Sequence, residues 1–121
     1  MMQDAFKKFF QKYPKSEAPF MHEQLAQWSD TRPLSGLRVV HHVPLVTNTL
    51  LKITCLLEAG ADVTVTNPSD FCHAHPQAIS CLNEAKIRYV ENPRSLIGET
   101  FDLYFDCGAQ LYQFLGKPKI G

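Results

Sequence analysis

The chain has no excess of charge of either sign and no long apolar run, and these two absences exclude several classes of protein. Its 121 residues include 12 Lys and Arg and 12 Asp and Glu, so the formal net charge is zero with histidine neutral. A nucleic-acid module that works through bulk positive charge would need a clear excess of Lys and Arg. No stretch approaches the roughly 18 apolar residues that a membrane-spanning helix requires. Because 45% of the residues are hydrophobic, the composition predicts one ordered globular domain.

The sequence also lacks a secretory signal and closely spaced cysteines. Residues 1–15 contain no uninterrupted apolar segment and no small-residue cleavage pattern. The four cysteines, Cys55, Cys72, Cys81 and Cys107, form no CxxC pair. Scattered cysteines in a chain with an ordinary core are typical of a reducing compartment, so we expect free thiols and a cytoplasmic location. We expect Cys55 and Cys81 to be small core residues.

Glycine-rich phosphate-binding motifs are missing as well. Neither GxGxxG nor GxxxxGK[ST] occurs, and residues 41–44, expected as the turn after the first strand, read HHVP. A pyrophosphate needs the close backbone approach that glycine allows. We therefore expect no cofactor on this chain. Its 121 residues also leave no room for a substrate domain together with a full dinucleotide domain.

The sequence does contain an alternation of short apolar strands and helical stripes. One such stripe joins Val46, Leu50, Ile53 and Leu57 at steps of four and three residues. This alternation predicts a three-layer, doubly wound α/β domain, Rossmann-like or flavodoxin-like, with a parallel sheet of at least four strands. The expected strands are 37–40, 63–66, 87–90 and 101–105, and the expected helices lie between and after them, at 46–59, from 76, at 92–98 and at 108–115.

Residues 1–33 are expected to form an N-terminal helical extension to the α/β domain at 34–121. The first of its two helices has an aromatic stripe at helical spacing, and the second covers 20–28. A stripe of this kind must pack against something. We expect the domain itself, a second copy or a partner protein, rather than a membrane. The stripe consists of Phe6, Phe9, Phe10 and Tyr13.

The carboxyl edge of the expected sheet is the predicted place for a ligand, because doubly wound sheets bind ligands beyond the carboxyl ends of their strands. Several polar residues follow the expected strands in the sequence. Those expected at this edge are His41, His42, Asn67, Glu91, Asp106 and Cys107.

Two kinds of reactive site fit some residues near this edge. The residue types suit zinc, but His73 and His75 lie two apart and no pair has the four-residue spacing of a helical metal motif. We therefore expect polar loop residues and no metal. Cys107, ahead of a helix, could act as a nucleophile with His42 as its base, although spacing alone does not fix that geometry. The residues with metal-ligand chemistry are His42, Cys72, His73, His75, Asp106 and Cys107.

Five short blocks of the sequence have counterparts in one enzyme family. Residues 17–19, EAP, are similar to its EMP, and residues 33–39, PLSGLRV, to its PLKGARI. Residues 49–53 and 57–63, TLLKI and LEAGADV, are similar to its TAVLI and LGAEV segments. Residues 105–111, FDCGAQL, are similar to its LDDGGDL. In these blocks the chain resembles the N-terminal, substrate-side domain of the S-adenosylhomocysteine hydrolase (adenosylhomocysteinase) family, over well more than half of its length.

The substrate-contacting positions differ from the family pattern. After the first strand, the family has His-Met-Thr and then Glu where this chain has Pro44, Leu45, Val46 and Asn48. The family's Ser-Thr-Gln-Asp stretch corresponds to residues 72–75, CHAH. The resemblance implies one catalytic residue, Asp106, which matches the first Asp of DDGG. We expect His42, Asn48, Asn67, His73 and Cys107 as substrate-binding residues.

The resemblance implies chemistry that needs a second domain. The family oxidises a ribose hydroxyl with bound NAD, eliminates homocysteine, adds water and reduces again. We therefore expect an adenosylhomocysteinase-like domain that has no hydrolase activity on its own and binds a nucleoside or small metabolite at the strand ends. Two alternatives stay open: a protein-interaction or dimerisation module, and a fragment of a longer NAD-dependent enzyme.

Overall fold

Strands and helices alternate along the part of the chain that the computed structural model describes, residues 4–14 and 16–120. The side chains of Phe9 and Phe10 lie outside this description. The elements are α1 (Asp4–Lys12), α2 (Pro19–Thr31), β1 (Arg38–His42), α3 (Thr49–Glu58), β2 (Asp62–Thr66), α4 (Pro76–Glu84), β3 (Arg88–Val90), the 3-10 helix η1 (Pro93–Leu96), β4 (Leu103–Asp106) and α5 (Gln110–Leu115).

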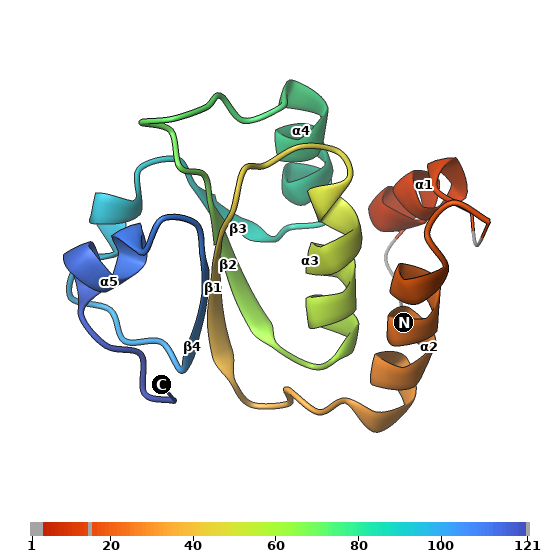
Figure 1. The fold of residues 1–121 in the computed structure, drawn as a ribbon, viewed down its shortest axis with the longest axis horizontal. Helices are drawn as coiled ribbons and strands as arrows, with labels where there is room; N and C mark the ends of the chain where they lie inside the picture. Colours follow the sequence, from red (N-terminus) through yellow and green to blue (C-terminus); the bar gives the residue numbers. More distant parts are fainter. Residues whose placement is uncertain (1–3, 15, 121) are drawn as a thin grey trace.

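The four strands form one parallel sheet in the order β3-β2-β1-β4. Val40 of β1 lies opposite Thr64 of β2 on one side and Tyr104 of β4 on the other. The chain moves outward from β1 to β2 and β3, then crosses back to place β4 on the other side of β1 (Figure 1). The predicted doubly wound α/β fold with a parallel sheet of four strands is thus confirmed.

Helices cover both faces of the sheet. α3 and α4 lie on one face, η1 and α5 lie on the other, and α1 and α2 form a further layer outside α3 (Figure 1). Successive strand residues point to opposite faces, so Val39 and His41 lie on the α3 side, whereas Val40 and His42 lie on the α5 side. No helix within the described ranges is long and apolar enough to cross a membrane.

The described side chains of the N-terminal aromatic stripe pack against the α/β domain of the same chain. Phe6 is 1% exposed and belongs to the main core. Tyr13 packs against the cluster of Leu51 and Cys55, and its hydroxyl lies 3.1 Å from Thr47 Oγ1. The predictions for Phe9 and Phe10 lie outside the described side chains.

Several predicted boundaries were wrong. The fourth strand, expected at 101–105, covers Leu103–Asp106, and the last helix, expected from 108, begins at Gln110. The turn after the first strand was expected to include His41 and His42, but both lie inside β1. The strand extends to His42 because β1 pairs with β2 on one side and with β4 on the other up to that residue. Val46 was expected on the helical stripe but lies in a loop, 36% exposed. A local turn precedes the helix there, since Thr49 Oγ1 donates to Val46 O at 2.8 Å.

Candidate functional site

The carboxyl ends of β1 and β4 bring three predicted site residues together. His42 and Asp106 are partners in the β1–β4 register, and the backbone N–H of Cys107 donates to His42 O at 2.9 Å. In-register residues of parallel strands point to the same face, which places the side chains of His42 and Asp106 on the α5 side. This is also where the strand order reverses, the usual ligand position in such folds.

His42 is fully buried, and one of its ring nitrogens reaches α5. Its Nε2 lies 3.0 Å from Oε1 of Gln110, an acceptor, so this nitrogen carries the proton in the bond. The other ring nitrogen, Nδ1, has no hydrogen-bond partner within the described chain. The same holds for Oγ1 of Thr66, which lies opposite His42 in β2, and for Oδ1 of Asp106. Buried polar atoms without a partner are rare. These three atoms at neighbouring strand ends therefore make the carboxyl edge of the sheet a candidate functional site.

Asp106 helps to fix the start of α5. Its Oδ2 accepts a hydrogen bond from the Leu111 backbone N–H at 2.8 Å, and this satisfies a donor of the first helical turn. The turn between β4 and α5 passes through Gly108 and Ala109, both with positive φ. The Asp106 carboxylate therefore holds the turn from which Gln110 reaches His42.

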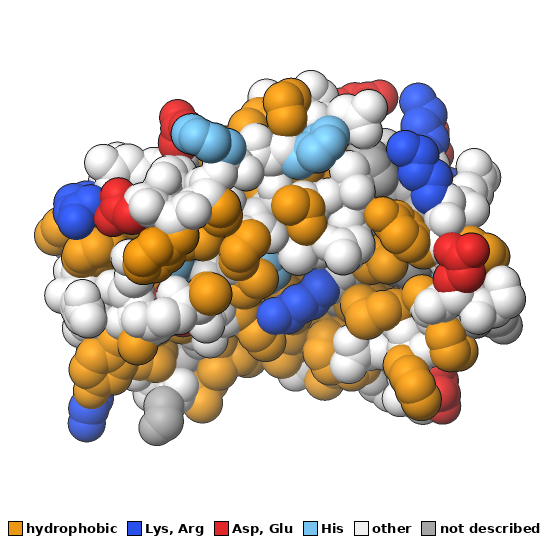
Figure 2. Space-filling model, turned by 45° about the horizontal axis from the view of Figure 1, so that its top comes forward, with side chains coloured by type: hydrophobic (Ala, Val, Ile, Leu, Met, Phe, Trp, Pro, Cys, Tyr) orange, Lys and Arg blue, Asp and Glu red, His pale blue; other side chains and the backbone are white. Residues whose placement is uncertain are grey.

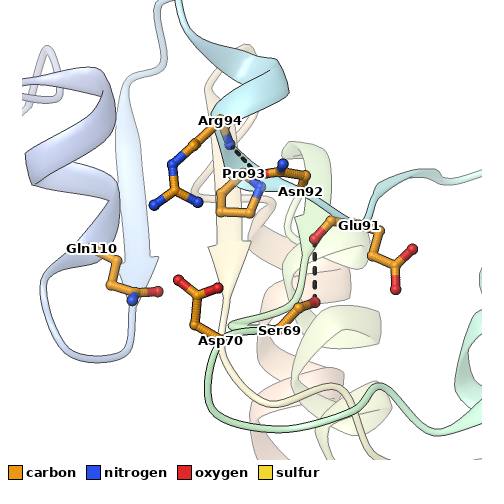
Figure 3. Close-up of a pocket in the computed structure, with 7 residues that line it drawn as sticks. All are labelled: Ser69, Asp70, Glu91, Asn92, Pro93, Arg94 and Gln110. Carbon is orange, nitrogen blue, oxygen red and sulfur yellow. Dashed lines mark hydrogen bonds between the residues drawn. The ribbon is translucent and has the colours of Figure 1, made fainter.

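A pocket of about 240 Å³ opens at the same edge of the sheet (Figure 3). His42 and Asp106 do not line it, but Gln110, which contacts His42, does. Its walls come from the loop after β2, the segment after β3 and the first residue of α5. Figure 3 shows the Arg94 guanidinium, the Asp70 carboxylate and the Gln110 amide extending into one space, whereas the Glu91 carboxylate points away from it. The lining residues are Ser69, Asp70, Glu91, Asn92, Pro93, Arg94 and Gln110.

Local contacts hold the pocket walls in place. The Arg94 guanidinium carbon lies 4.4 Å from the ring centroid of Phe114 in α5, a cation–π contact. Oδ1 of Asn92 accepts from the Arg94 backbone N–H at 3.0 Å, which caps η1. Oγ of Ser69 donates to Glu91 O at 3.4 Å and connects the two loops. Of the lining residues, only Glu91 was among those expected at this edge.

The remaining predicted binding residues have other positions. Asn67 is fully buried and ties two loops, because its Oδ1 accepts from Leu45 N at 2.9 Å and its Nδ2 donates to Cys72 O at 2.9 Å. Asn48 and His73 are exposed, and neither lines the pocket. The structure thus gathers His42, Asp106 and Cys107 but leaves Asn48 and His73 apart from them.

The thiols divide into buried and accessible groups. Burial raises the pKa of Cys55 and of Cys81 to about 11, so both remain protonated, as predicted for core residues. Cys107 is exposed at the turn after β4. Its thiol makes no hydrogen bond to His42 within the described chain, where Nε2 of His42 is engaged by Gln110 instead. The contacts therefore do not form a Cys–His pair.

His41, the neighbour of His42, lies on the opposite face of the sheet. Burial, with smaller contributions from the charges of Lys52 and His42, lowers the pKa of His41 to about 3. Its ring is therefore neutral at physiological pH. Among residues 4–14 and 16–120, no three His, Cys, Asp or Glu side chains are grouped as ligands for a metal ion.

Sequence reasoning missed Ser69, Asp70, Arg94 and Gln110. The first two follow the second expected strand, and Gln110 belongs to the FDCGAQL block, so their neighbourhood was recognised. What places them together is the crossover from β3 to β4, which sets α5 beside the loops after β2 and β3. No local motif records that proximity.

The surface offers no broad patch of one charge on the face drawn in Figure 2. Acidic and basic side chains are scattered over this face of the described chain among hydrophobic ones, and histidine side chains lie exposed near its upper rim (Figure 2). A second hollow, of about 270 Å³, lies between α1 and α4 and has a more apolar lining. The polar pocket at the carboxyl edge is therefore the better candidate for a polar ligand.

Comparison with known protein-family models and with curated proteins finds no match to this chain.

Proposed function

We propose that this chain is a small-molecule-binding domain that holds a nucleoside or small metabolite at the carboxyl edge of its sheet. The observation that carries the proposal is the pocket of about 240 Å³ at the carboxyl edge of the sheet, with polar side chains from three segments. One of them, Gln110, contacts His42 at the strand-order reversal. Ligand sites in doubly wound sheets occur at such reversals. The volume lies below the range of roughly 300–1,000 Å³ usual for drug-sized ligands, which favours a metabolite.

The resemblance to adenosylhomocysteinases suggests a nucleoside as the first ligand to test. It does not suggest that hydrolysis persists. Pro44 stands at the position of the family's His and cannot transfer a proton. Val46 stands at the position of its Thr and cannot hydrogen-bond a ribose hydroxyl. We therefore propose binding without hydrolysis by this chain.

Isothermal titration calorimetry with adenosine and with S-adenosylhomocysteine tests the proposal. We expect saturable heat at up to millimolar ligand and no release of homocysteine from S-adenosylhomocysteine. Gln110→Leu should weaken binding by about tenfold, because it removes a polar group from the pocket wall. Gln113→Leu is the matched control, since it makes the same change on an exposed residue of α5 outside the pocket.

Gln110→Glu separates loss of binding from loss of folding, because it retains an acceptor for His42 Nε2. The thermal midpoint of each variant should be recorded beside its affinity. Absence of heat with both ligands would overturn the nucleoside version of the proposal. Equal affinity of Gln110→Leu and Gln113→Leu would move the site away from this pocket.

A further inference from the structure

The pocket at the carboxyl edge has opposite charges on facing walls. Asp70 comes from the loop after β2 and Arg94 from η1, and both side chains extend into the same space (Figure 3). Within the described chain, no ion pair joins the two or ties either of them to another charged group. One cavity thus presents an anion and a cation that are not joined in an ion pair.

The two charges differ in what they can bind. Arg94 offers a planar fork of donors that suits a carboxylate, and its stacking on Phe114 at 4.4 Å orients the guanidinium. The Asp70 carboxylate can only accept hydrogen bonds when ionised, so it suits an ammonium group. Gln110 forms a third side of the pocket, and because its Oε1 is occupied by His42, its amide NH₂ is the group left to donate to a ligand.

We propose that this pocket binds the zwitterionic end of an α-amino acid, with the ligand carboxylate at Arg94 and Gln110 and its ammonium at Asp70. The inference rests on the proposed binding function and names the chemical class of the ligand. A metal cation is disfavoured there by the guanidinium. A simple dianion or dication would leave one of the two walls facing a like charge.

The test is a titration of the isotope-labelled chain followed by the amide NMR signals of Asp70, Arg94 and Gln110. Three probes of similar size are compared: L-alanine, N-acetyl-L-alanine, which lacks the ammonium, and L-alaninamide, which lacks the carboxylate. We expect L-alanine to shift these signals with millimolar affinity. Each derivative should bind at least about tenfold more weakly, because one charge-assisted contact is lost.

Two substitutions assign the two contacts. Asp70→Asn should abolish the preference for L-alanine over N-acetyl-L-alanine, and Arg94→Gln should abolish its preference over L-alaninamide. Asp30→Asn is the control, because it makes the same change as Asp70→Asn at an exposed position of α2 outside the pocket. This variant should bind each of the three probes within about twofold of the affinity of the native chain.

Either derivative binding as tightly as L-alanine would overturn the inference, and so would an equal loss in Asp30→Asn. Adenosine binding in the same assay distinguishes this failure from that of the proposed function. Binding of adenosine without L-alanine would overturn the zwitterion inference alone. No shift with any probe would overturn both.

Discussion

His41 and His42 are adjacent in β1 but have different surroundings, because successive residues of a strand point to opposite faces of the sheet. His42 meets Gln110 on the α5 side, at the edge of the pocket. His41 is fully buried on the α3 side, and neither of its ring nitrogens has a partner within the described chain. A buried ring without partners resists protonation, which is why its pKa falls to about 3.

Because the ring of His41 is buried, we expect His41 to make the stability of the fold sensitive to acid. Its folded pKa is lowered from 6.5 to about 3, so the unfolded chain binds the proton first and stability falls as pH drops through that window. The loss should be on the order of 3 kcal/mol between about pH 6.5 and pH 4. His41→Leu keeps a similar volume and should remove this part of the pH dependence.

Urea unfolding of the native chain and of His41→Leu across that pH range is the measurement. The difference between the two curves isolates His41 from the carboxylates, which titrate in both proteins. Parallel curves would show that the ring is solvated or has a partner, contrary to the structure.

At the scale of elements, α1 is part of the core rather than a detachable arm. Its Phe6 is 1% exposed among side chains of the sheet, α3 and α4, and Ala5 is buried beside it. The sequence showed that the aromatic stripe needed a partner, but it left open whether that partner was the domain or another molecule. For Phe6 and Tyr13, the partner is the domain.

Phe6→Ala should therefore cost about 3–5 kcal/mol of unfolding free energy, as expected for a large buried aromatic. Phe20→Ala is the control, because Phe20 in α2 is 81% exposed and its loss should cost less than about 0.5 kcal/mol. Chemical denaturation gives the stability, and light scattering gives the mass. Equal stability of the two variants, with a fall in mass for Phe6→Ala, would indicate an intermolecular contact instead.

A second element-scale feature anchors the crossover from β3 to β4. Glu99, in the segment between η1 and β4, receives two bonds of 2.7 Å from Arg88 of β3 and one of 3.2 Å from Arg38 of β1. The bonds from Arg88, supported by Arg38, lower the pKa of Glu99 to about 2. This crossover also sets the position of α5, so the anchor indirectly shapes the pocket.

Glu99→Gln should lower stability by about 1 kcal/mol at neutral pH, a modest amount because both arginines are partly exposed. A carboxyl whose folded pKa is lowered stabilises the fold above its unfolded pKa, near 4.5, and loses that contribution as pH falls toward 2. Urea unfolding at pH 7 and at pH 3 should therefore show a smaller difference between native chain and variant at pH 3. Glu23→Gln, at an exposed position of α2, should change neither value. A difference that persisted unchanged in acid would contradict the ion-pair account.

At the scale of the whole molecule, periodicity predicted the fold because each strand and helix carries its own local pattern. The strands at 63–66 and 87–90 were expected within a residue of β2 and β3, and Gly60 marks the turn after α3. The extension of β1 to His42 was missed, because it depends on pairing with β2 and β4 rather than on local sequence.

The candidate site was predictable only as a location. His42, Asp106 and Cys107 were expected at the carboxyl edge from the rule that ligands bind beyond strand ends. Asp70 and Arg94 are 24 positions apart in the sequence and meet across one pocket because β2 and β3 are parallel neighbours whose carboxyl ends lie at the same edge. Gln110 joins them because the β3–β4 crossover places α5 beside these loops. Asn67 was expected to bind substrate but has its side-chain amide fully occupied by loop contacts, which no sequence pattern indicates.

The central claim is that a small ligand binds at the carboxyl edge of the sheet, and amide NMR with adenosine tests it most directly. We expect concentration-dependent shifts centred on Ser69, Asp70, Arg94 and Gln110. The hollow between α1 and α4, reported by Gln77 and Ser80, should stay unchanged. Shifts centred on Gln77 and Ser80, or no shifts with either adenosine or L-alanine at millimolar concentration, would contradict it.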